Sequence, residues 1–220
     1  MLTIPILSIN LLPIAGYYLP VQAALAAPGD DTLRVMTLNV RGGNKRIDLI
    51  EAVFRAESSD SDLLLLSRPP VMDLGVQHLG ADKKSTLVAT VCSTAVATRC
   101  IDIMAAHLER PQSRTLTRVR DTHLQDMATI VRNAHADKTV VVSDFNLTPW
   151  SPYFQQFLSD AGLRDSARGR RVAPTWFSRW LPFGLPIDQV LVGAGISVID
   201  RHVGADVGSD HLPVIADPSF

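Results

Sequence analysis

The sequence predicts an α/β domain of the α+β kind, in which two mixed β-sheets pack together and helices lie outside them. From Thr32 onward, short apolar runs alternate with stretches of helical spacing. Two β-rich runs, at 86–92 and 100–107, are close enough along the chain to form a hairpin, which favours mixed sheets over a purely parallel one. The 220 residues are 46% hydrophobic and 20% charged, which suits one ordinary globular core.

Each element is assigned from its own pattern. Strands are expected at short apolar runs, most of them rich in β-branched residues, at 33–40, 63–66, 86–92, 100–107, 139–142, 187–192, 196–202 and 213–216. Helices are expected where apolar residues recur every three or four positions, at 47–56, 114–134 and 152–161. A Pro- and Gly-rich loop before 187–192 either contacts a substrate's base, sugar or lipid or covers the core, and it holds the aromatic residues Trp176, Phe177, Trp180 and Phe183.

The first 29 residues differ from the rest because no charged side chain precedes Asp30. Ala24-Leu25-Ala26 resembles a signal-peptidase site, but no Lys or Arg follows Met1. The segment is therefore the leader of an exported protein, a membrane segment or a buried apolar arm. In each case its apolar side chains are removed from contact with water. We expect an apolar leader or membrane-associated arm at 1–29, with membrane contact through 1–27, and a domain at 30–220. The protein is expected to be a membrane-associated or exported monomer.

Cysteine usage and charge exclude several classes of protein. Two cysteines, Cys92 and Cys100, are too few for a disulfide scaffold and lack zinc-site spacing. Two buried reduced thiols are favoured, and a bridge across the hairpin is the alternative if the protein is exported. The net charge of −1 gives no broad basic field for nucleic acid, although a local basic patch stays possible.

Polar residues at the ends of apolar runs carry the candidate chemistry. Asp144 and Asn146 follow the run at 139–142, where a carboxylate and an amide can hold a divalent ion and orient a water or phosphate oxygen. A plain Asx-turn is the alternative for this pair. Asp210 directly before His211 suggests an ion pair with the histidine poised near neutral pH, or else a capping turn. Weaker single signals of the same kind are Asn39, His107 and Asp188.

Together and in this order, these positions resemble the endonuclease/exonuclease/phosphatase superfamily, whose fold is similar to that of DNase I. The resemblance covers roughly residues 33–216 and is similar to the bacterial branch with hydrophobic N-terminal segments. It implies a DNase I-like four-layer sandwich of two mixed sheets with helices outside. The matching strings are Thr37-Leu38-Asn39-Val40, Ala106-His107-Leu108, Ser143-Asp144-Phe145-Asn146-Leu147-Thr148-Pro149, Ile187-Asp188-Gln189-Val190-Leu191 and Gly208-Ser209-Asp210-His211-Leu212-Pro213.

The resemblance also implies a role for each matched residue. Asp144 orients or deprotonates the attacking water, and Asn146 steadies the phosphate. His211 contacts the scissile phosphate and is polarised by its neighbour or by Asp188. His107 binds the phosphate or assists the leaving group. Such a set supplies the charge neutralisation and the in-line water that a phosphate ester needs.

The metal-binding half of the pattern is incomplete. Asn39 and Asp210 are implied to hold Mg²⁺ or Mn²⁺, but the family places its central ligand, a Glu, at the end of its second core strand. Here the run at 63–66 ends in Ser67-Arg68, which resembles a later family string, and an arginine cannot ligate a cation. One strand–helix unit is therefore expected to be missing. Glu57 is the one candidate substitute ligand.

We therefore expect a Mg²⁺- or Mn²⁺-dependent hydrolase of a phosphodiester or phosphomonoester that uses an activated water. Because the Glu is missing, the alternative is an impaired or inactive member of the same fold that acts as a binding or structural module. A serine hydrolase using Ser209 and His211 is disfavoured, since the two lie too close along the chain. Nucleic acid, nucleotide and phospholipid head group are not distinguished as phosphate-ester substrates.

Overall fold

The computed structural model describes residues 14–20, 30–40, 71–93, 96, 98–178 and 181–220. The helix predicted at 47–56 and the strand predicted at 63–66 lie outside these residues, and so does Glu57. Within the part of the chain that the structure describes, no helix combines the length and the apolar character needed to span a bilayer.

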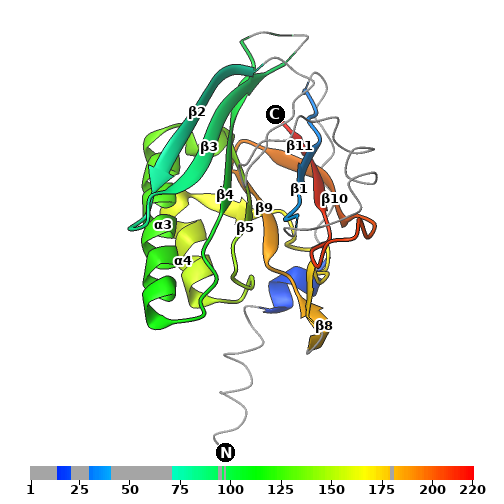
Figure 1. The fold of residues 1–220 in the computed structure, drawn as a ribbon. Helices are drawn as coiled ribbons and strands as arrows, with labels where there is room; N and C mark the ends of the chain where they lie inside the picture. The colour runs from blue at the N-terminus through cyan, green and yellow to red at the C-terminus, as the bar shows by residue number, and fades with distance from the viewer. Residues whose placement is uncertain (1–13, 21–29, 41–70, 94–95, 97, 179–180) are drawn as a thin grey trace, which may run out of the picture.

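Two β-sheets packed face to face form the centre of the domain (Figure 1). The larger sheet is mixed, because β4 and β5 run parallel while its other neighbours are antiparallel. In spatial order its strands are β2 (Val71–Leu79), β3 (Lys84–Cys92), β4 (Cys100–His107), β5 (Thr139–Asp144), β9 (Asp188–Gly193) and β6 (Leu163–Asp165). The smaller sheet consists, in its described strands, of β1 (Val35–Thr37), β11 (Val214–Ser219) and β10 (Ser197–Val203).

Apolar residues of the two facing sheets form one buried cluster. Val35 of β1 and Val214 of β11 lie in the same cluster as Val140 of β5 and Val190 of β9, and the last three are fully buried. Burying such side chains is the main favourable term in folding. The cluster therefore fixes β5 and β9, whose ends carry candidate site residues, against the smaller sheet.

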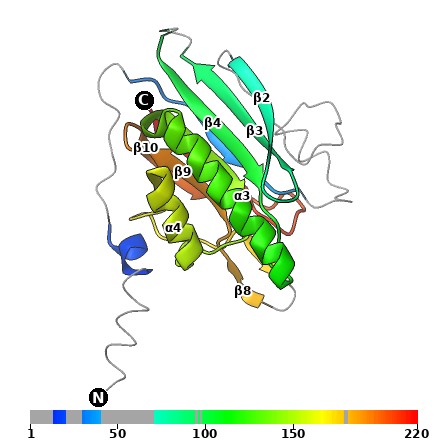
Figure 2. The ribbon, with the colours of Figure 1, turned by 90° about the vertical axis from the view of Figure 1, so that its left-hand side faces the viewer.

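Two helices cover the outer face of the larger sheet (Figure 2). The first, α3 (Arg114–Asn133), begins at Ser113, whose hydroxyl accepts a hydrogen bond from the backbone N–H of Leu116. The second, α4 (Pro152–Ala161), ends as predicted at Gly162, which adopts φ 69° in the left-handed region. A short 3₁₀ turn, η1 (Ala136–Lys138), leads from α3 into β5.

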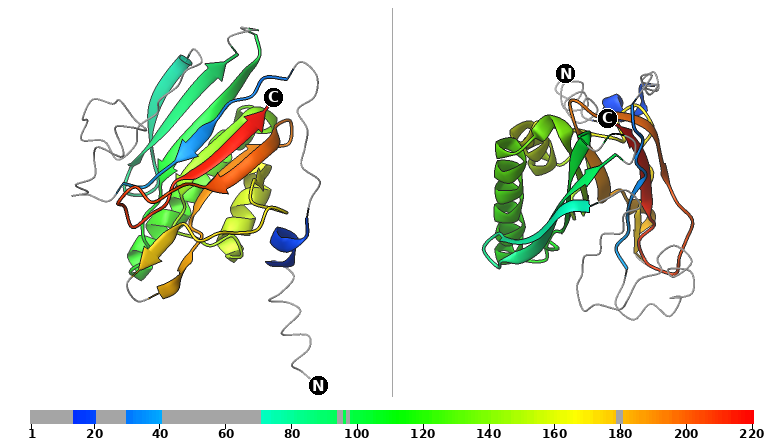
Figure 3. Two further views of the ribbon diagram at one scale, coloured as in Figure 1. Left: turned by 90° about the vertical axis from the view of Figure 1, so that its right-hand side faces the viewer. Right: turned by 90° about the horizontal axis from the view of Figure 1, so that it is seen from above.

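Seen from above, the helices, the larger sheet and the smaller sheet follow one another as layers (Figure 3). This arrangement confirms the predicted DNase I-like α/β sandwich. Among the described residues, α3 and α4 lie on the larger sheet alone, and the smaller sheet is antiparallel.

Three strands correct the sequence analysis: the edge strand β2 and the paired strands β7 and β8. β2 was not predicted, although Met72, Leu74 and Val76 alternate with polar or small residues; it is an edge strand with eight of its nine residues exposed. The aromatic loop expected before 187–192 instead forms a hairpin of β7 (Trp176–Ser178) and β8 (Leu181–Leu185). Edge and hairpin strands bury little surface, so the pattern of buried residues that marks a strand is weak in both.

A disulfide joins Cys92 and Cys100 across the β3–β4 hairpin. The two residues are direct cross-strand partners with their Cα atoms 4.0 Å apart. The favoured expectation of two reduced thiols is therefore wrong. The error arose because sequence spacing alone does not tell a bridged pair from two thiols that merely face each other in a hairpin.

Replacing both cysteines with alanine is expected to lower the free energy of unfolding by about 2 kcal/mol, because the bridge closes a short loop and restricts the unfolded chain. Urea unfolding of the double variant and of oxidised and reduced wild type measures the effect. Reduced wild type should unfold at the same urea concentration as the variant. Equal stability of all three samples would contradict the expectation.

Candidate active site

Three neighbouring strands place polar side chains in one row across the larger sheet. His107 ends β4 and is the register partner of Asp144, which ends the parallel strand β5. Asp144 is in turn the partner of Asp188, which begins the antiparallel strand β9. Register partners point to the same face and lie one strand spacing, about 4.8 Å, apart. The sheet alone therefore gathers three of the predicted site residues.

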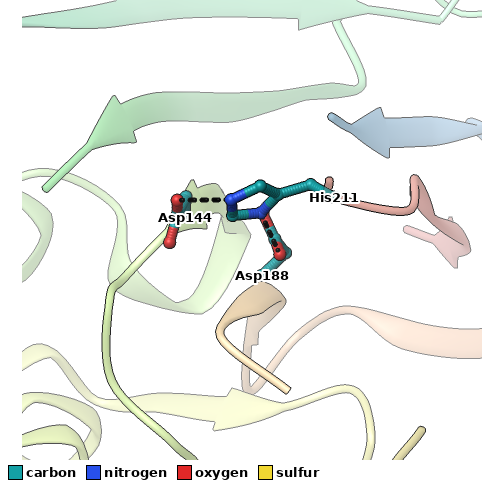
Figure 4. A group of neighbouring side chains, drawn as sticks. All are labelled: Asp144, Asp188 and His211. Carbon is teal, nitrogen blue, oxygen red and sulfur yellow. Dashed lines mark hydrogen bonds and ion pairs between the residues drawn. The ribbon is translucent and has the colours of Figure 1, made fainter. Parts of the chain in front are cut away.

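His211 reaches this row from the loop before β11 and lies between the two carboxylates (Figure 4). Its Nδ1 lies 2.9 Å from Oδ2 of Asp188, and its Nε2 lies 3.8 Å from Oδ2 of Asp144. All three side chains are buried, since Asp188 is 0%, His211 1% and Asp144 3% exposed. Of the two polarising partners considered from the sequence, Asp188 holds the ring nitrogen.

The charges of this cluster shift its pKa values. Burial lowers the pKa of His211, but the hydrogen bond to Asp188 and the charges of both aspartates outweigh burial and raise that pKa above its usual value. Burial and the nearby charge of Asp188 also raise the pKa of Asp144. A histidine that favours its charged form and a carboxylate with increased proton affinity suit proton transfer.

Asn39 lies beyond the end of β1 and contacts the cluster from the smaller sheet. Its Nδ2 donates to Oδ2 of Asp144 at 2.8 Å and lies 3.4 Å from Nε2 of both His107 and His211. The Nε2 atom of His107 lies 3.6 Å from the same carboxylate oxygen of Asp144. The His107 side chain remains 34% exposed, so a ligand can reach it from solvent.

Asn146 lies one step away from the cluster. Its backbone N–H donates to Oδ1 of Asp144 at 2.9 Å with φ at 49°, so the Asx-turn considered from the sequence is present. Its side-chain Nδ2 donates to the carbonyl of Leu108 at 2.8 Å. Asn146 thus ties the loop after β5 to the residue that follows His107 in the chain, which holds the ends of β4 and β5 together.

Two sets of residues could hold a cation. Oδ1 of Asp210 is buried and has no hydrogen-bond partner among the described residues, as expected for a ligand atom that awaits a cation. The hydroxyl of Ser209 donates to the backbone carbonyl of Asn39 at 2.8 Å, which brings the predicted ligands Asn39 and Asp210 into neighbouring loops. A second set of possible ligand atoms lies within 4.8 Å of one another and comes from Asp144, Asp188 and His211. The donor chemistry therefore fits a hard cation.

The structure also identifies supporting residues that the sequence analysis missed. The hydroxyl of the buried Thr175 accepts hydrogen bonds from the backbone N–H groups of Ile187 and Asp188, both at 3.1 Å. The ring of Trp176 lies 6.4 Å from that of His211, and a β-bridge joins the two residues. The one signal available for them was the aromatic loop itself, which ends shortly before Asp188.

Ser209 does not have the geometry of a nucleophile. Its hydroxyl accepts from the backbone N–H of His211 at 3.2 Å while it donates to the carbonyl of Asn39. A nucleophilic serine would instead donate to a ring nitrogen of its histidine base. The geometry therefore agrees with the sequence in disfavouring a serine hydrolase.

The fold is that of a DNase I-like α/β sandwich, and comparison with protein families agrees. A family model described as the endonuclease/exonuclease/phosphatase family matches residues 36–211, so the chain belongs to that family. Its members are hydrolases that act on phosphate esters and depend on divalent metals. No curated protein matches the sequence.

Solved structures share the fold at low sequence identity. The human Nocturnin catalytic domain with bound sulfate matches with a TM-score of 0.57 and 17% identity, over 69% of this chain and 59% of that one. An endonuclease/exonuclease/phosphatase from Beutenbergia cavernae gives 0.56 and 24%, over 70% and 46%. The mannosyl-6-phosphatase Bt3783 of Bacteroides thetaiotaomicron gives 0.52 and 14%, over 69% and 67%. The chain thus covers less than two thirds of the first two proteins.

Proposed function

We propose that this chain is a divalent-metal-dependent phosphoesterase that hydrolyses a phosphodiester or a phosphomonoester with an activated water. The observation that carries the proposal is the position of His211 between the buried carboxylates of Asp144 and Asp188. Family membership supports the reaction class, and one structural neighbour is named as a mannosyl-6-phosphatase.

Asp144 is the proposed base for the attacking water. Its raised pKa makes the carboxylate a better proton acceptor than an ordinary aspartate, and Asn39 and Asn146 each hold one of its oxygens in place. His211 contacts the phosphate through Nε2 while Asp188 holds Nδ1. The positive charge that the raised pKa favours then lies where negative charge develops on the phosphate.

His107 and Asn146 are proposed to contact the phosphate group. His107 is partly exposed, and its Nε2 lies next to Asp144, the proposed base for the attacking water. His107 is therefore within reach of the phosphate or of the leaving group. Asn146 has a second amide N–H beyond the one that it donates to Leu108, and a phosphate oxygen is the proposed acceptor for it.

Asn39 and Asp210 are proposed to hold Mg²⁺ or Mn²⁺. When bound, the cation neutralises the charge of the phosphate and lowers the pKa of a coordinated water. Asp210 supplies a buried oxygen without a partner among the described residues, and its charge also helps to raise the pKa of His211. Glu57 is kept as a substitute ligand for the carboxylate that the family pattern places at its second core strand.

A catalytically impaired binding or structural module is the second candidate function. The observation in its favour is that the Glu of the family pattern has no counterpart at the matching position of the sequence. Hard cations depend on charged oxygen ligands, so the loss of one carboxylate weakens metal binding. The two candidates therefore differ in whether a metal-dependent turnover exists.

Hydrolysis of bis-p-nitrophenyl phosphate and of p-nitrophenyl phosphate is expected in the presence of Mg²⁺ or Mn²⁺, and a chelator should abolish it. Asp144→Ala and His211→Ala should each lower the rate by about 10²-fold or more, because each removes a proton-transfer group. Thermal unfolding of each variant checks that it is folded. An equal, metal-insensitive background in all three proteins would rule out the enzyme and leave the binding module.

We also propose that the protein is exported or held at a membrane and acts as a monomer. The disulfide between Cys92 and Cys100 supports export, because such bonds persist in oxidising compartments and are rare in the cytosol. The uncharged sequence of residues 1–29 supports the same location.

A further inference from the structure

The β7–β8 hairpin, residues 176–185, is attached directly to the candidate active site. Trp176 forms a β-bridge with His211, and the backbone N–H of Phe177 donates to the carbonyl of Asp210 at 3.0 Å. The position of the hairpin is therefore fixed relative to the catalytic histidine. Any surface that the hairpin contacts lies next to the site.

This hairpin presents two phenyl rings to solvent. Phe183 is 84% exposed, more than any other large hydrophobic side chain in the described part of the chain, and Phe177 is 42% exposed. Gly184 has φ at 61°, and a Cβ built there would lie only 2.9 Å from Cε1 of Phe177. The glycine thus allows the Phe177 ring to pack against the opposite strand of the hairpin. Two exposed rings on one short hairpin form apolar surface that the described residues do not bury.

The apolar N-terminal arm joins the domain near this hairpin. Tyr17 is fully buried, and its carbonyl accepts a hydrogen bond from the backbone N–H of Arg171 at 3.0 Å. The next residues, Tyr18 and Leu19, are 53% and 65% exposed. The loop that holds Tyr17 continues along the chain into β7, so the arm and the hairpin are anchored to the two ends of one short segment.

The short helix at 14–18 and the β7–β8 hairpin lie at the same end of the molecule, next to a loop that contains arginines. In Figures 1 and 2 the short helix at 14–18 and strand β8 both lie at the lower end of the domain. Arg171, where the arm attaches, is exposed, and so is Arg168 just before it, whose guanidinium lies 5.9 Å over the ring of Tyr17. Aromatic rings beside exposed arginines match a phospholipid surface, where rings settle at head-group depth and cations meet phosphates.

We propose that this end of the domain docks on a phospholipid bilayer, with Phe183 and Phe177 inserted at head-group depth beside the active site. The sequence argues for a bilayer rather than a protein partner. No charged side chain precedes Asp30, so the sequence that leads to Tyr17 is apolar enough to partition into lipid. Docking brings the candidate site to the level of the head groups.

Vesicle flotation with the full chain tests the docking, using vesicles of phosphatidylcholine with and without phosphatidylglycerol. Changing both rings, Phe177→Ser with Phe183→Ser, should reduce the partition coefficient by about tenfold or more, since each ring contributes buried apolar area. Leu74→Ser is the matched control, because Leu74 is 59% exposed on the edge strand β2, away from the hairpin. This control should bind as wild type does. Equal binding by the double variant would overturn the proposal.

A spectroscopic reporter gives a second readout that does not depend on a loss of binding. The indole emission of Phe183→Trp should shift to shorter wavelength when vesicles are added, relative to wild type, while Leu74→Trp should show no such shift. The absence of the shift in Phe183→Trp would place the hairpin outside the membrane and overturn the proposal. Both measurements need no turnover, and Asp144→Ala should bind vesicles as wild type does, so docking and the proposed phosphoesterase activity fail independently.

Discussion

Asp188→Asn is expected to lower kcat/KM for bis-p-nitrophenyl phosphate by about 10²- to 10⁴-fold, the range that a positioned proton-transfer group contributes. Asp188 is completely buried and holds Nδ1 of His211 at 2.9 Å, so asparagine keeps the shape of the side chain and removes its charge. Burial alone lowers the pKa of His211, and the hydrogen bond to Asp188 is the first influence that raises it. Without that charge, the limb of the pH–rate profile that reports His211 moves to lower pH.

Asp217→Asn is the matched control for this variant. Asp217 accepts two hydrogen bonds from Arg34 at 2.7 Å on the smaller sheet, away from the cluster, so the same chemical change there should leave activity and pH profile as in wild type. Thermal unfolding of both variants shows whether a loss of activity is a loss of folded protein. If folded Asp188→Asn kept its activity and its pH profile, the role of His211 would not depend on its hydrogen bond to Asp188.

The row of site residues could be predicted because each member follows or opens an apolar run. Buried strands carry a strong sequence signal, and polar residues at their ends stand out against it. His107, Asp144 and Asp188 could therefore be placed at strand ends, and the structure brings them into one register row. That Asp188 rather than Asp210 holds His211 was not decidable from sequence, since it depends on how the loop before β11 meets β9.

Other features could not be predicted because their cause lies in tertiary packing. The hydroxyl of Thr175 supports Asp188 by accepting hydrogen bonds from two backbone N–H groups. No pattern in the sequence around Thr175 predicts that contact. The hairpin at 176–185 reads as a loop because Pro and Gly interrupt it, and its pairing is set by its attachment to His211. β2 is different, since the alternation of Met72, Leu74 and Val76 with polar or small residues was readable from the sequence.

Arg201→Met is expected to lower the free energy of unfolding by about 3 to 5 kcal/mol, because it leaves a buried carboxylate without its compensating charge. Arg201 is 7% exposed, and its Nη2 donates to Oε1 of Gln189 at 3.3 Å. The carboxylate is Asp165, which is 4% exposed; burial raises its pKa, while the N–H of Ala167 and the charge of Arg201 oppose that rise. Urea unfolding measures the loss.

The dependence of this loss on pH follows from its sign. Removing Arg201 raises the pKa of Asp165 further in the folded protein than in the unfolded chain, so protonation favours the fold, and the stability of the variant falls as pH rises through the folded pKa. The deficit should therefore be larger at neutral than at acidic pH. Adding Asp165→Asn to Arg201→Met should recover most of the stability at neutral pH, because the uncompensated charge is gone.

Arg34→Met is the matched control for the change of arginine to methionine. Arg34 makes a close ion pair, with Nη2 2.7 Å from Oδ2 of Asp217, but its side chain is 69% exposed. An exposed pair contributes about 0 to 1 kcal/mol, because water and salt screen it. The exposed ion pair of Arg34 should thus contribute less to the free energy of unfolding than the buried charge of Arg201. Equal losses in the two variants would mean that Asp165 is neutral in the folded protein and that burial, not pairing, sets its charge.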